Sequence, residues 1–484
     1  MEYLLAELSH IPVIFFVCIG WILRLLALVI VPRNRHPMSG MAWLMLIFLV
    51  PAIGWIIFLM FGNPKLPKHR RNLQARVDHY LASIDQGDTQ ARQVIDGKYN
   101  QVINLTESLA HMPVTYTDRY EVLDAYDDVF ARLTQDIVNA KEVVYVSYYI
   151  FALDDSTKAI LQALVDAHKR GVSVYVLYDS YSLVRYRQWA RSAVSYLKSA
   201  GVPVVASLPF SLAPTRYLRP DLRNHRKMVT IDHEICYTGS QNIIDKTYHR
   251  KDSLYYQELV VRMEGHITKH IEVVFATDWL AETKENILLF DPAARRHNKQ
   301  TNLRAQVLPS GPGYSDENNL KVFTALFYTA QRSITIVNPY FVPDSDLMTA
   351  ITSAARRGIA VTMVNSEIID QFFVGHAQRS YYEELLDAGV HIYLHRSPAL
   401  VHSKFIIIDD EVSTVGSSNM DIRSFLLDSE LTVVVYGAQF ASSLQAVADT
   451  YLANSKMIDK EIWLTRPVAH KIFDTIARLT ASIQ

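Results

Sequence analysis

Two stretches of this chain follow one pattern: HRKMVTIDHEICYTGSQN at residues 225–242 and HSKFIIIDDEVSTVGSSN at residues 402–419. Each begins with His-x-Lys and continues to an Asp, then to a Gly-Ser pair, and ends on an Asn. All of these residues stand at the same offsets from the histidine in both copies. A single copy would carry little information, because His, Lys and Asp are common residues. Two copies with the same trailing residues indicate a duplicated domain and one site to which both copies contribute.

The sequence around the two motifs repeats as well. Segments with helical spacing alternate with short β-branched runs, an order typical of a sheet covered by helices. A helix is expected at residues 120–139. The expected strands lie at residues 142–150, 172–178, 202–206, 228–231 and 258–263, and again at 333–337, 359–364, 390–394, 405–408 and 431–435. We therefore predict an α/β protein with two tandem α/β/α domains and mixed sheets, at residues 113–290 and 291–484.

The N-terminal part of the chain has a different composition. Residues 11–31 and 41–61 are mostly apolar, and each stretch is long enough to cross a hydrocarbon core of about 30 Å. We therefore predict a transmembrane helical hairpin at residues 1–63, followed by a basic helical connector at residues 64–112. Two positive residues lie in the link and five follow the second span. By the positive-inside rule, this bias puts the rest of the chain in the cytoplasm.

Composition narrows the function further. The formal net charge of −1 on 484 residues offers no basic surface for coating nucleic acid. Two cysteines are too few for a disulfide framework or a cysteine zinc site. The sequence thus indicates no metal and no cofactor. Residues 467–483 are expected to form an amphipathic helix that packs on the second domain, with contact with a membrane as the alternative.

The repeated residue types suit chemistry on a phosphodiester. Such a bond resists attack because its oxygens repel nucleophiles and its alkoxide leaves poorly, so cations, a neutral nucleophile and a proton donor are needed. Imidazole can serve as nucleophile or as acid near neutral pH. The candidate catalytic residues are His225, Lys227, Asp232, His402, Lys404 and Asp409. Within this set we expect the two Asp residues to be structural.

The remaining motif residues are candidates for holding the substrate and the histidines. Candidate phosphate-binding residues are Asn242, Asn419, Ser240 and Ser417. A histidine in this role usually needs a carboxylate to fix its tautomer. Glu258 and Glu430 open the next strand of each repeat and are the expected partners. The sequence leaves open whether each glutamate serves its own histidine or the other one.

One segment distinguishes the first repeat from the second. The stretch from Gly201 to His225 is nearly twice as long as the corresponding stretch from Gly389 to His402. The extra length falls on residues 209–220, PFSLAPTRYLRP. The candidate residues for contact with membrane or substrate are Phe210, Leu212, Leu218, Arg216, Arg219 and Arg223. Apolar side chains could enter lipid while arginines hold phosphates. An ordinary surface loop is the alternative.

These residues resemble the phospholipase D superfamily, whose signature is the duplicated His-Lys-Asp motif. The resemblance narrows to bacterial cardiolipin synthases through the N-terminal hairpin and several further segments. These segments are DLRNHRK at 221–227, YTGS at 237–240, SGPG at 310–313, PYFVP at 339–343 and NMDIRS at 419–424. The resemblance covers essentially the whole chain.

The resemblance implies that two phosphatidylglycerol molecules condense into cardiolipin and glycerol, with His225 as nucleophile and His402 as acid and base. It also implies a multi-pass protein of the bacterial inner membrane that binds these lipids and needs neither metal nor nucleic acid. The oligomeric state stays open, a dimer included. The alternatives are a phospholipase D-type hydrolase, a transferase with another acceptor, a nucleic-acid phosphodiesterase and a catalytically inactive scaffold.

Overall fold

The structure, a computed structural model, describes residues 2–33, 35, 37–84, 92–93, 95–210, 218–249, 254–288 and 303–481. It divides into two units, Met1–Lys65 and Leu66–Gln484, and each is described by itself.

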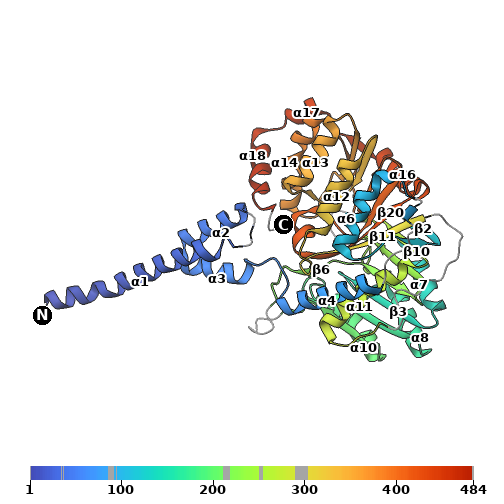
Figure 1. Ribbon diagram of the computed structural model, residues 1–484, viewed down its shortest axis with the longest axis horizontal. Helices are drawn as coiled ribbons and strands as arrows, with labels where there is room; N and C mark the ends of the chain where they lie inside the picture. Colours follow the sequence, from blue (N-terminus) through green and yellow to red (C-terminus); the bar gives the residue numbers. More distant parts are fainter. Residues whose placement is uncertain are drawn as a thin grey trace. The chain divides into compact units, whose positions relative to one another are not determined.

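The first unit consists of three helices. They are α1 (Glu2–Ile30), α2 (Pro37–Leu49) and α3 (Pro51–Phe61). α2 and α3 lie side by side (Figure 1). The rings of Trp43 on α2 and Phe58 on α3 are accordingly 5.5 Å apart. The chain turns at Val50, which has non-helical dihedral angles and precedes a proline without an N–H donor.

This turn corrects the predicted hairpin. The expected second span, residues 41–61, is divided into helices of 13 and 11 residues. At 1.5 Å per residue they are about 20 Å and 17 Å long, well short of a hydrocarbon core. Among all the residues described, no helix is both long enough and apolar enough to cross a membrane. The predicted transmembrane hairpin at residues 1–63 is therefore wrong, and the predicted multi-pass topology is not confirmed.

The second unit contains a seven-stranded mixed sheet formed by the first repeat. Its strands, in spatial order, are β2 (Arg119–Leu123), β10 (Val260–Glu264), β8 (Ile235–Gly239), β7 (Met228–Ile231), β3 (Val143–Tyr148), β4 (Ser173–Asp179) and β5 (Val204–Ser207). β3, β4 and β5 are parallel, and the other neighbours are antiparallel.

The second repeat forms a ten-stranded sheet with the same central order. Its strands are β1 (Thr115–Thr117), β11 (Leu303–Ser310), β20 (Asp428–Tyr436), β18 (Val412–Gly416), β17 (Phe405–Ile408), β12 (Ser333–Val337), β14 (Ala360–Ser366), β15 (His391–His395) and β21 (Ser455–Met457), with β6 (Arg223–Asn224) paired to β20. β1 precedes the first repeat's strands in the chain but pairs with β11 in this second sheet. The predicted mixed α/β sheets are present in both repeats.

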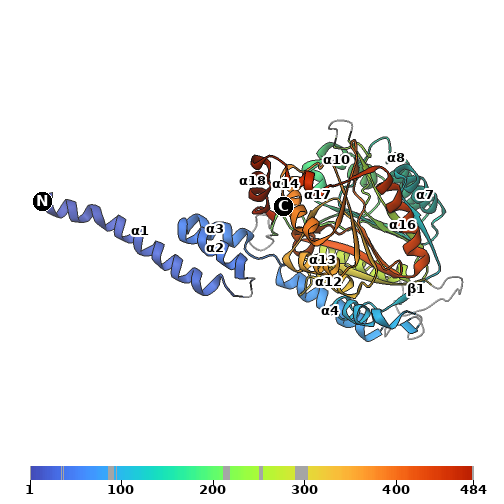
Figure 2. The same cartoon turned by 90° about the horizontal axis from the view of Figure 1, so that it is seen from above.

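Helices cover the two sheets (Figures 1 and 2). α7, α8 and α10 pack on one side of the first sheet, and α11 packs against its strands and also against β11. α12, α13 and α14 lie on one side of the second sheet, and α16 lies on the other. The bounds of the first repeat's helices are α7 (Tyr126–Asn139), α8 (Lys158–Lys169), α9 (Ser182–Arg185), α10 (Arg187–Ser199) and α11 (Ile267–Thr283). Those of the second are α12 (Asn318–Thr329), α13 (Ser345–Arg356), α14 (Phe372–Ala388), α15 (Ile422–Leu426), α16 (Ala438–Ala453), α17 (Lys460–Leu464) and α18 (Val468–Arg478).

The segment before the first sheet contains α4 (Lys68–Ile84), a 3-10 turn (Gly97–Tyr99) and α6 (Asn100–Ala110). Two small parallel pairs complete the unit. β13 (Phe341–Val342) pairs with β19 (Met420–Asp421), and β16 (Ala399–Val401) pairs with β9 (Tyr255–Gln257). The β16–β9 and β6–β20 pairs each join one repeat to the other. These two pairs position the candidate site.

Candidate active site

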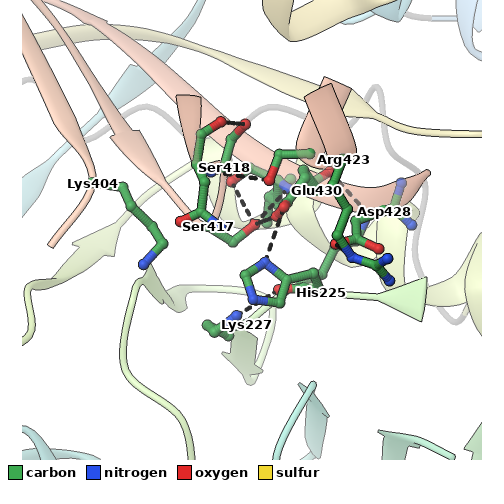
Figure 3. Close-up of polar contacts among 12 residues, drawn as sticks. His225, Lys227, Lys404, Ser417, Ser418, Arg423, Asp428 and Glu430 are labelled. Atoms are coloured by element: carbon green, nitrogen blue, oxygen red, sulfur yellow. Dashed lines mark hydrogen bonds and ion pairs between the residues drawn. The ribbon is translucent and has the colours of Figure 1, made fainter. Parts of the chain in front are cut away.

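Two histidine–glutamate pairs form the centre of the site. His225 Nδ1 lies 2.9 Å from Glu430 Oε1. His402 Nδ1 lies 2.8 Å and 2.9 Å from the two carboxylate oxygens of Glu258. Figure 3 shows His225 directed toward Glu430, which comes from the other repeat. Each histidine therefore contacts the glutamate of the opposite repeat, which answers the question that the sequence left open.

Backbone pairing between the repeats produces this exchange. The His225 N–H donates to the Ser429 carbonyl oxygen at 2.9 Å, directly after the β6–β20 pair. The His402 N–H donates to the Gln257 carbonyl oxygen at 2.7 Å, directly after the β16–β9 pair. In both cases the glutamate is the residue that follows the acceptor. The register of the β6–β20 and β16–β9 pairs therefore places each glutamate beside the histidine of the opposite repeat.

The Gly-Ser pairs let the next strand approach closely. A Cβ at Gly239 would collide with the carbonyl oxygen of Leu259, so only glycine fits there. This closeness lets the Ser240 N–H donate to the same carbonyl oxygen at 2.9 Å. Gly416 and Ser417 repeat the arrangement in the second copy. The glycines thus serve backbone packing beside the glutamates.

The two serine hydroxyls lie behind the glutamates and do not line the cavity described below. The Ser417 hydroxyl donates to Glu430 Oε2. The Ser240 hydroxyl accepts a hydrogen bond from the Leu259 N–H at 2.9 Å. Contact with a substrate phosphate, predicted for both serines, is thus not what this geometry favours.

Both motif lysines are buried beside the histidines. Lys227 Nζ donates to the His225 carbonyl oxygen at 2.7 Å, and Lys404 Nζ donates to the His402 carbonyl oxygen at 2.5 Å. Burial lowers the pKa of Lys227 to about 8 and that of Lys404 to about 7. The carboxylates of Glu430 and Glu258 oppose this lowering of the pKa at both lysines.

One cavity of about 920 Å³ contains the reactive groups. Both histidines line it, and so do Asn242 and Asn419. The Asn242 carbonyl oxygen of the side chain accepts a hydrogen bond from the Ile150 N–H at 3.1 Å, which fixes that amide in the wall. The structure therefore brings together the histidines and asparagines of both motifs.

The electrostatic surroundings make both imidazoles neutral near pH 7. Burial, reinforced by the charges of Lys227 and Lys404, lowers the pKa of His225 well below its ordinary value. Burial also lowers the pKa of His402, but Glu258 opposes the shift. A neutral imidazole has a free lone pair, which a nucleophile requires.

The two glutamates differ in charge. Burial raises the pKa of Glu430 to about 7, with Lys227 opposing the shift. Burial acts on Glu258 in the same direction, but His402 and Lys404 outweigh it and its pKa is lowered. Glu258 is therefore ionised at neutral pH, whereas Glu430 is only partly so.

The motif Asp residues do not line the cavity. The Asp232 carboxylate accepts hydrogen bonds from the backbone N–H groups of residues 141–143, at 2.8–3.1 Å. The Asp409 carboxylate does the same for residues 331–333, at 2.7–3.1 Å. Both aspartates therefore tie a turn to the start of the neighbouring strand, β3 or β12. A catalytic contact is not what this position favours.

The loop before the first histidine matches its prediction only in part. Leu212 and Arg216 lie outside the described residues. Phe210 is exposed, whereas Leu218 is buried, so contact of this loop with lipid stays a prediction that only Phe210 favours among its described apolar residues.

The two described arginines of this segment, Arg219 and Arg223, form ion pairs within the protein. Arg223 is buried, and its guanidinium contacts Asp179 at 3.1 Å. Arg219 forms an ion pair with Asp221 at 2.6 Å. Arg223 nevertheless lines the cavity described above, so its contact with substrate stays a prediction.

Several residues around the two histidines were not predicted from the sequence. The ring of Tyr149 packs edge-on against His225 at 4.8 Å, and that of Tyr256 packs edge-on against His402 at 5.4 Å. Asp428 also lines the cavity. Tyr256 and Asp428 each stand two residues before the glutamate of their repeat, so aligning the repeats on Glu258 and Glu430 would have found both.

Comparison with known proteins agrees with this geometry. The family model described as "Cardiolipin synthase, PLD-like domain" matches residues 133–279 and 323–451, one match in each repeat. The crystal structure of a phosphatidylserine synthase from Haemophilus influenzae superposes with a TM-score of 0.60 and 14% identity, and covers 79% of this chain and 99% of that one. That likeness concerns the fold alone.

Curated relatives span almost the full length. Cardiolipin synthase A from Klebsiella pneumoniae is 32% identical over 481 residues, which is 96% of this chain and 98% of that protein. Cardiolipin synthase A from Yersinia pseudotuberculosis is 31% identical over 456 residues, which is 92% of this chain and 93% of that protein. The chain therefore belongs to the cardiolipin synthase family of phospholipase D-like enzymes.

Proposed function

We propose that this protein condenses two phosphatidylglycerol molecules into cardiolipin and glycerol through a phosphohistidine. The observation that carries the proposal is the pair of buried histidines on one cavity, each held by a glutamate of the other repeat. Two imidazoles on one phosphorus can act as nucleophile and as acid without any further cofactor. The names of the relatives supply the substrate class.

In the first half-reaction, His225 is the nucleophile. With Nδ1 held by Glu430, its other ring nitrogen, Nε2, attacks the phosphorus of one lipid. The P–N bond forms as the bond from phosphorus to the headgroup glycerol oxygen breaks. His402, protonated for this step, gives its proton to that oxygen, and glycerol leaves.

The second half-reaction reverses these roles with a new alcohol. A glycerol hydroxyl of the second lipid passes its proton to His402 and attacks the phosphorus. The P–N bond breaks, and its electron pair returns to His225. Both His402 and His225 are then as they began, and cardiolipin is released.

The unequal glutamates support this division of labour. Ionised Glu258 stabilises the protonated form of His402, which an acid and base must reach in each cycle. The pKa of His225 is lowered more strongly, which keeps its lone pair available. The amides of Asn242 and Asn419, which line the cavity, would hold the phosphate oxygens. Lys227 and Lys404 do not line the cavity, and their charges would attract the phosphate from beside the histidines.

The test is conversion of labelled phosphatidylglycerol in vesicles, with all products resolved. Cardiolipin and glycerol in equal amounts, together with a labelled acid-labile and base-stable protein adduct, support the proposal. His225→Ala should abolish both product and adduct. His391→Ala, which changes an exposed histidine of β15, is the matched control and should have no effect.

Other outcomes point to other activities. Phosphatidic acid without cardiolipin would mean that water is the acceptor, and the proposal would be rejected in favour of a hydrolase. Cleavage of DNA by the wild type, lost in His225→Ala, would reject the lipid substrate altogether.

A further inference from the structure

The C-terminal helix α18 exposes its apolar face. Val468, Ile472 and Ile476 recur every four residues, and Leu479 follows directly after the helix, so the four side chains form one stripe. Their exposed fractions are 71%, 55%, 54% and 81%. A helix that packs on a soluble domain normally buries such a stripe. The sequence-based expectation that this amphipathic helix simply packs on the second domain therefore accounts for only one of its faces.

Polar contacts hold the opposite face of α18 to the domain. Asp474 is buried, and it contacts His376 Nδ1 of α14 at 2.7 Å and Arg466 Nη1 at 3.0 Å. Ala477 is buried three residues further along, on the same side. Because Asp474 lies two residues from Ile472, the anchored side and the apolar stripe point in opposite directions. The apolar stripe is thus exposed because the contacts of Asp474 hold the opposite face of α18 against the domain.

The apolar surface continues to the mouth of the active-site cavity. Phe372 and Phe373, at the start of α14, are 63% and 56% exposed and also line the cavity. The ring of Phe473 on α18 lies 5.6 Å from that of Phe372. Thr480, after α18, lines the same cavity. We call the stripe of α18, with Phe372, Phe373 and Phe473, the apolar rim.

We propose that the apolar rim docks on the surface of a phospholipid bilayer. A contiguous exposed apolar surface of this kind marks an interaction site, and an amphipathic helix with large apolar residues on one face is suited to lie in a lipid interface. The rim borders the opening through which the substrate enters, so its partner must also deliver the substrate. This inference rests on the lipid substrates of the proposed function, because acyl chains that reach the cavity must come from a bilayer.

The test is amide hydrogen exchange of the full-length chain, with and without vesicles of phosphatidylglycerol and phosphatidylethanolamine. Vesicles should slow exchange in residues 468–478 by about tenfold or more, because burial of even one large apolar side chain shifts an equilibrium by that factor. The triple variant Ile472→Ser/Ile476→Ser/Leu479→Ser should lose this protection. Its melting temperature should match that of the wild type, because these side chains are already exposed.

A matched control changes exposed apolar side chains elsewhere. Val138 on α7 and Tyr328 on α12 are each 48% exposed, and Val138→Ser/Tyr328→Ser should keep the full protection. Unchanged exchange in α18 on vesicles, or equal protection in the triple variant, would overturn the proposal. Protection without vesicles that grows with protein concentration would assign the rim to a second copy of the chain. The measurement needs no turnover, so protection of α18 without any cardiolipin synthesis would refute the proposed function and leave bilayer docking in place.

Discussion

The two histidine–glutamate pairs have the same backbone frame and different electrostatics. In both pairs the histidine N–H binds the carbonyl oxygen just before the foreign glutamate, and a Gly-Ser pair packs behind that glutamate. The pKa of Glu258 is nevertheless lowered, whereas that of Glu430 is raised to about 7. The duplication therefore placed the two glutamates at equivalent backbone positions, and the residues around each glutamate give them different pKa values.

The neighbours that differ occupy matched positions. Two residues before Glu258 stands Tyr256, whose hydroxyl donates to Asp370 at 3.0 Å. Two residues before Glu430 stands Asp428, and burial raises its pKa to about 8. The charge of Glu430 contributes to the raised pKa of Asp428, whereas burial is the main cause of the raised pKa of Glu430 itself. The roles of the two histidines therefore follow from the residues around each pair, because the motif itself is the same in both repeats.

The largest difference between the two histidines is expected when each is removed and the leaving group of the substrate is varied. His225→Ala should abolish turnover with every substrate because no phosphohistidine can form. His402→Ala should lose about 10²–10⁴-fold with phosphatidylglycerol, the usual contribution of acid–base catalysis. In a phosphatidyl ester of p-nitrophenol, the leaving group departs as the stable p-nitrophenolate anion and needs no proton. With this substrate His402→Ala should therefore still release a burst of p-nitrophenolate.

The burst is measured by absorbance, with the adduct trapped by denaturation in base, where a phosphohistidine survives. A burst in His225→Ala and none in His402→Ala would exchange the two roles. No burst in either variant would mean that both histidines are needed to bind the phosphate, and the division of labour would be rejected.

A smaller effect is expected when the carboxylates are neutralised one at a time. Glu258→Gln removes the charge that stabilises protonated His402, so kcat/KM should fall by about 10²-fold, at the low end of the acid–base range. Glu430→Gln should cost less than about tenfold, because a carboxyl that is already half protonated loses less on replacement. Steady-state kinetics measures the loss of kcat/KM in each variant, and equal melting temperatures confirm that both variants are folded. Equal losses would show that the two pairs are electrostatically alike.

The sequence was sufficient to predict the repeated motif positions, but not the differences between the two histidine–glutamate pairs. Motif spacing predicted the site because identical offsets place identical residues on equivalent strands. The exchange of Glu258 and Glu430 could not be predicted, since it depends on the short β6–β20 and β16–β9 pairs between the repeats. β2 was predicted as the start of a helix, because no Gly or Pro separates it from α7.

The transmembrane hairpin was also predicted wrongly because the tertiary arrangement is not visible in the sequence. Apolar length at residues 41–61 predicted one span, whereas Pro51 divides it and the apolar faces pack on each other. Hydropathy measures how apolar a segment is, and it does not detect a turn within that segment. The pKa values of the site were equally out of reach, because they depend on burial that only the folded chain creates.

The two motif lysines differ in pKa, and this difference should appear in the pH dependence of kcat/KM. The pKa of Lys404 is lowered to about 7 and that of Lys227 to about 8, so Lys404 loses its charge first as the pH rises. If these charges hold the phosphate, kcat/KM should fall above about pH 7, approaching tenfold per pH unit. Lys404→Arg keeps its charge at every accessible pH, and the alkaline decline should move upward toward the value of Lys227. A pH–rate profile of the variant that matches the wild type would show that another group causes the decline.

The smallest effect on chemistry is expected at the motif aspartates, where the repeats should behave alike. Three backbone N–H groups outweigh burial and hold the pKa of Asp409 below its ordinary value. Its stabilisation is therefore complete above the unfolded pKa of about 4 and is lost as pH falls toward the lower folded value. Asp409→Asn should cost about 1–3 kcal/mol of stability at pH 7, because an amide replaces a charged acceptor of several hydrogen bonds. The difference in melting temperature from the wild type should shrink as the pH falls below about 4.

Activity separates this structural role from a catalytic one. The kcat per folded molecule of Asp409→Asn should stay within about threefold of the wild type, since neither aspartate lines the cavity. Asp232→Asn should repeat this behaviour in the first repeat, where the same three backbone donors converge on the carboxylate. A large loss of kcat in either folded variant would show that the aspartate takes part in catalysis, and its purely structural role would be rejected.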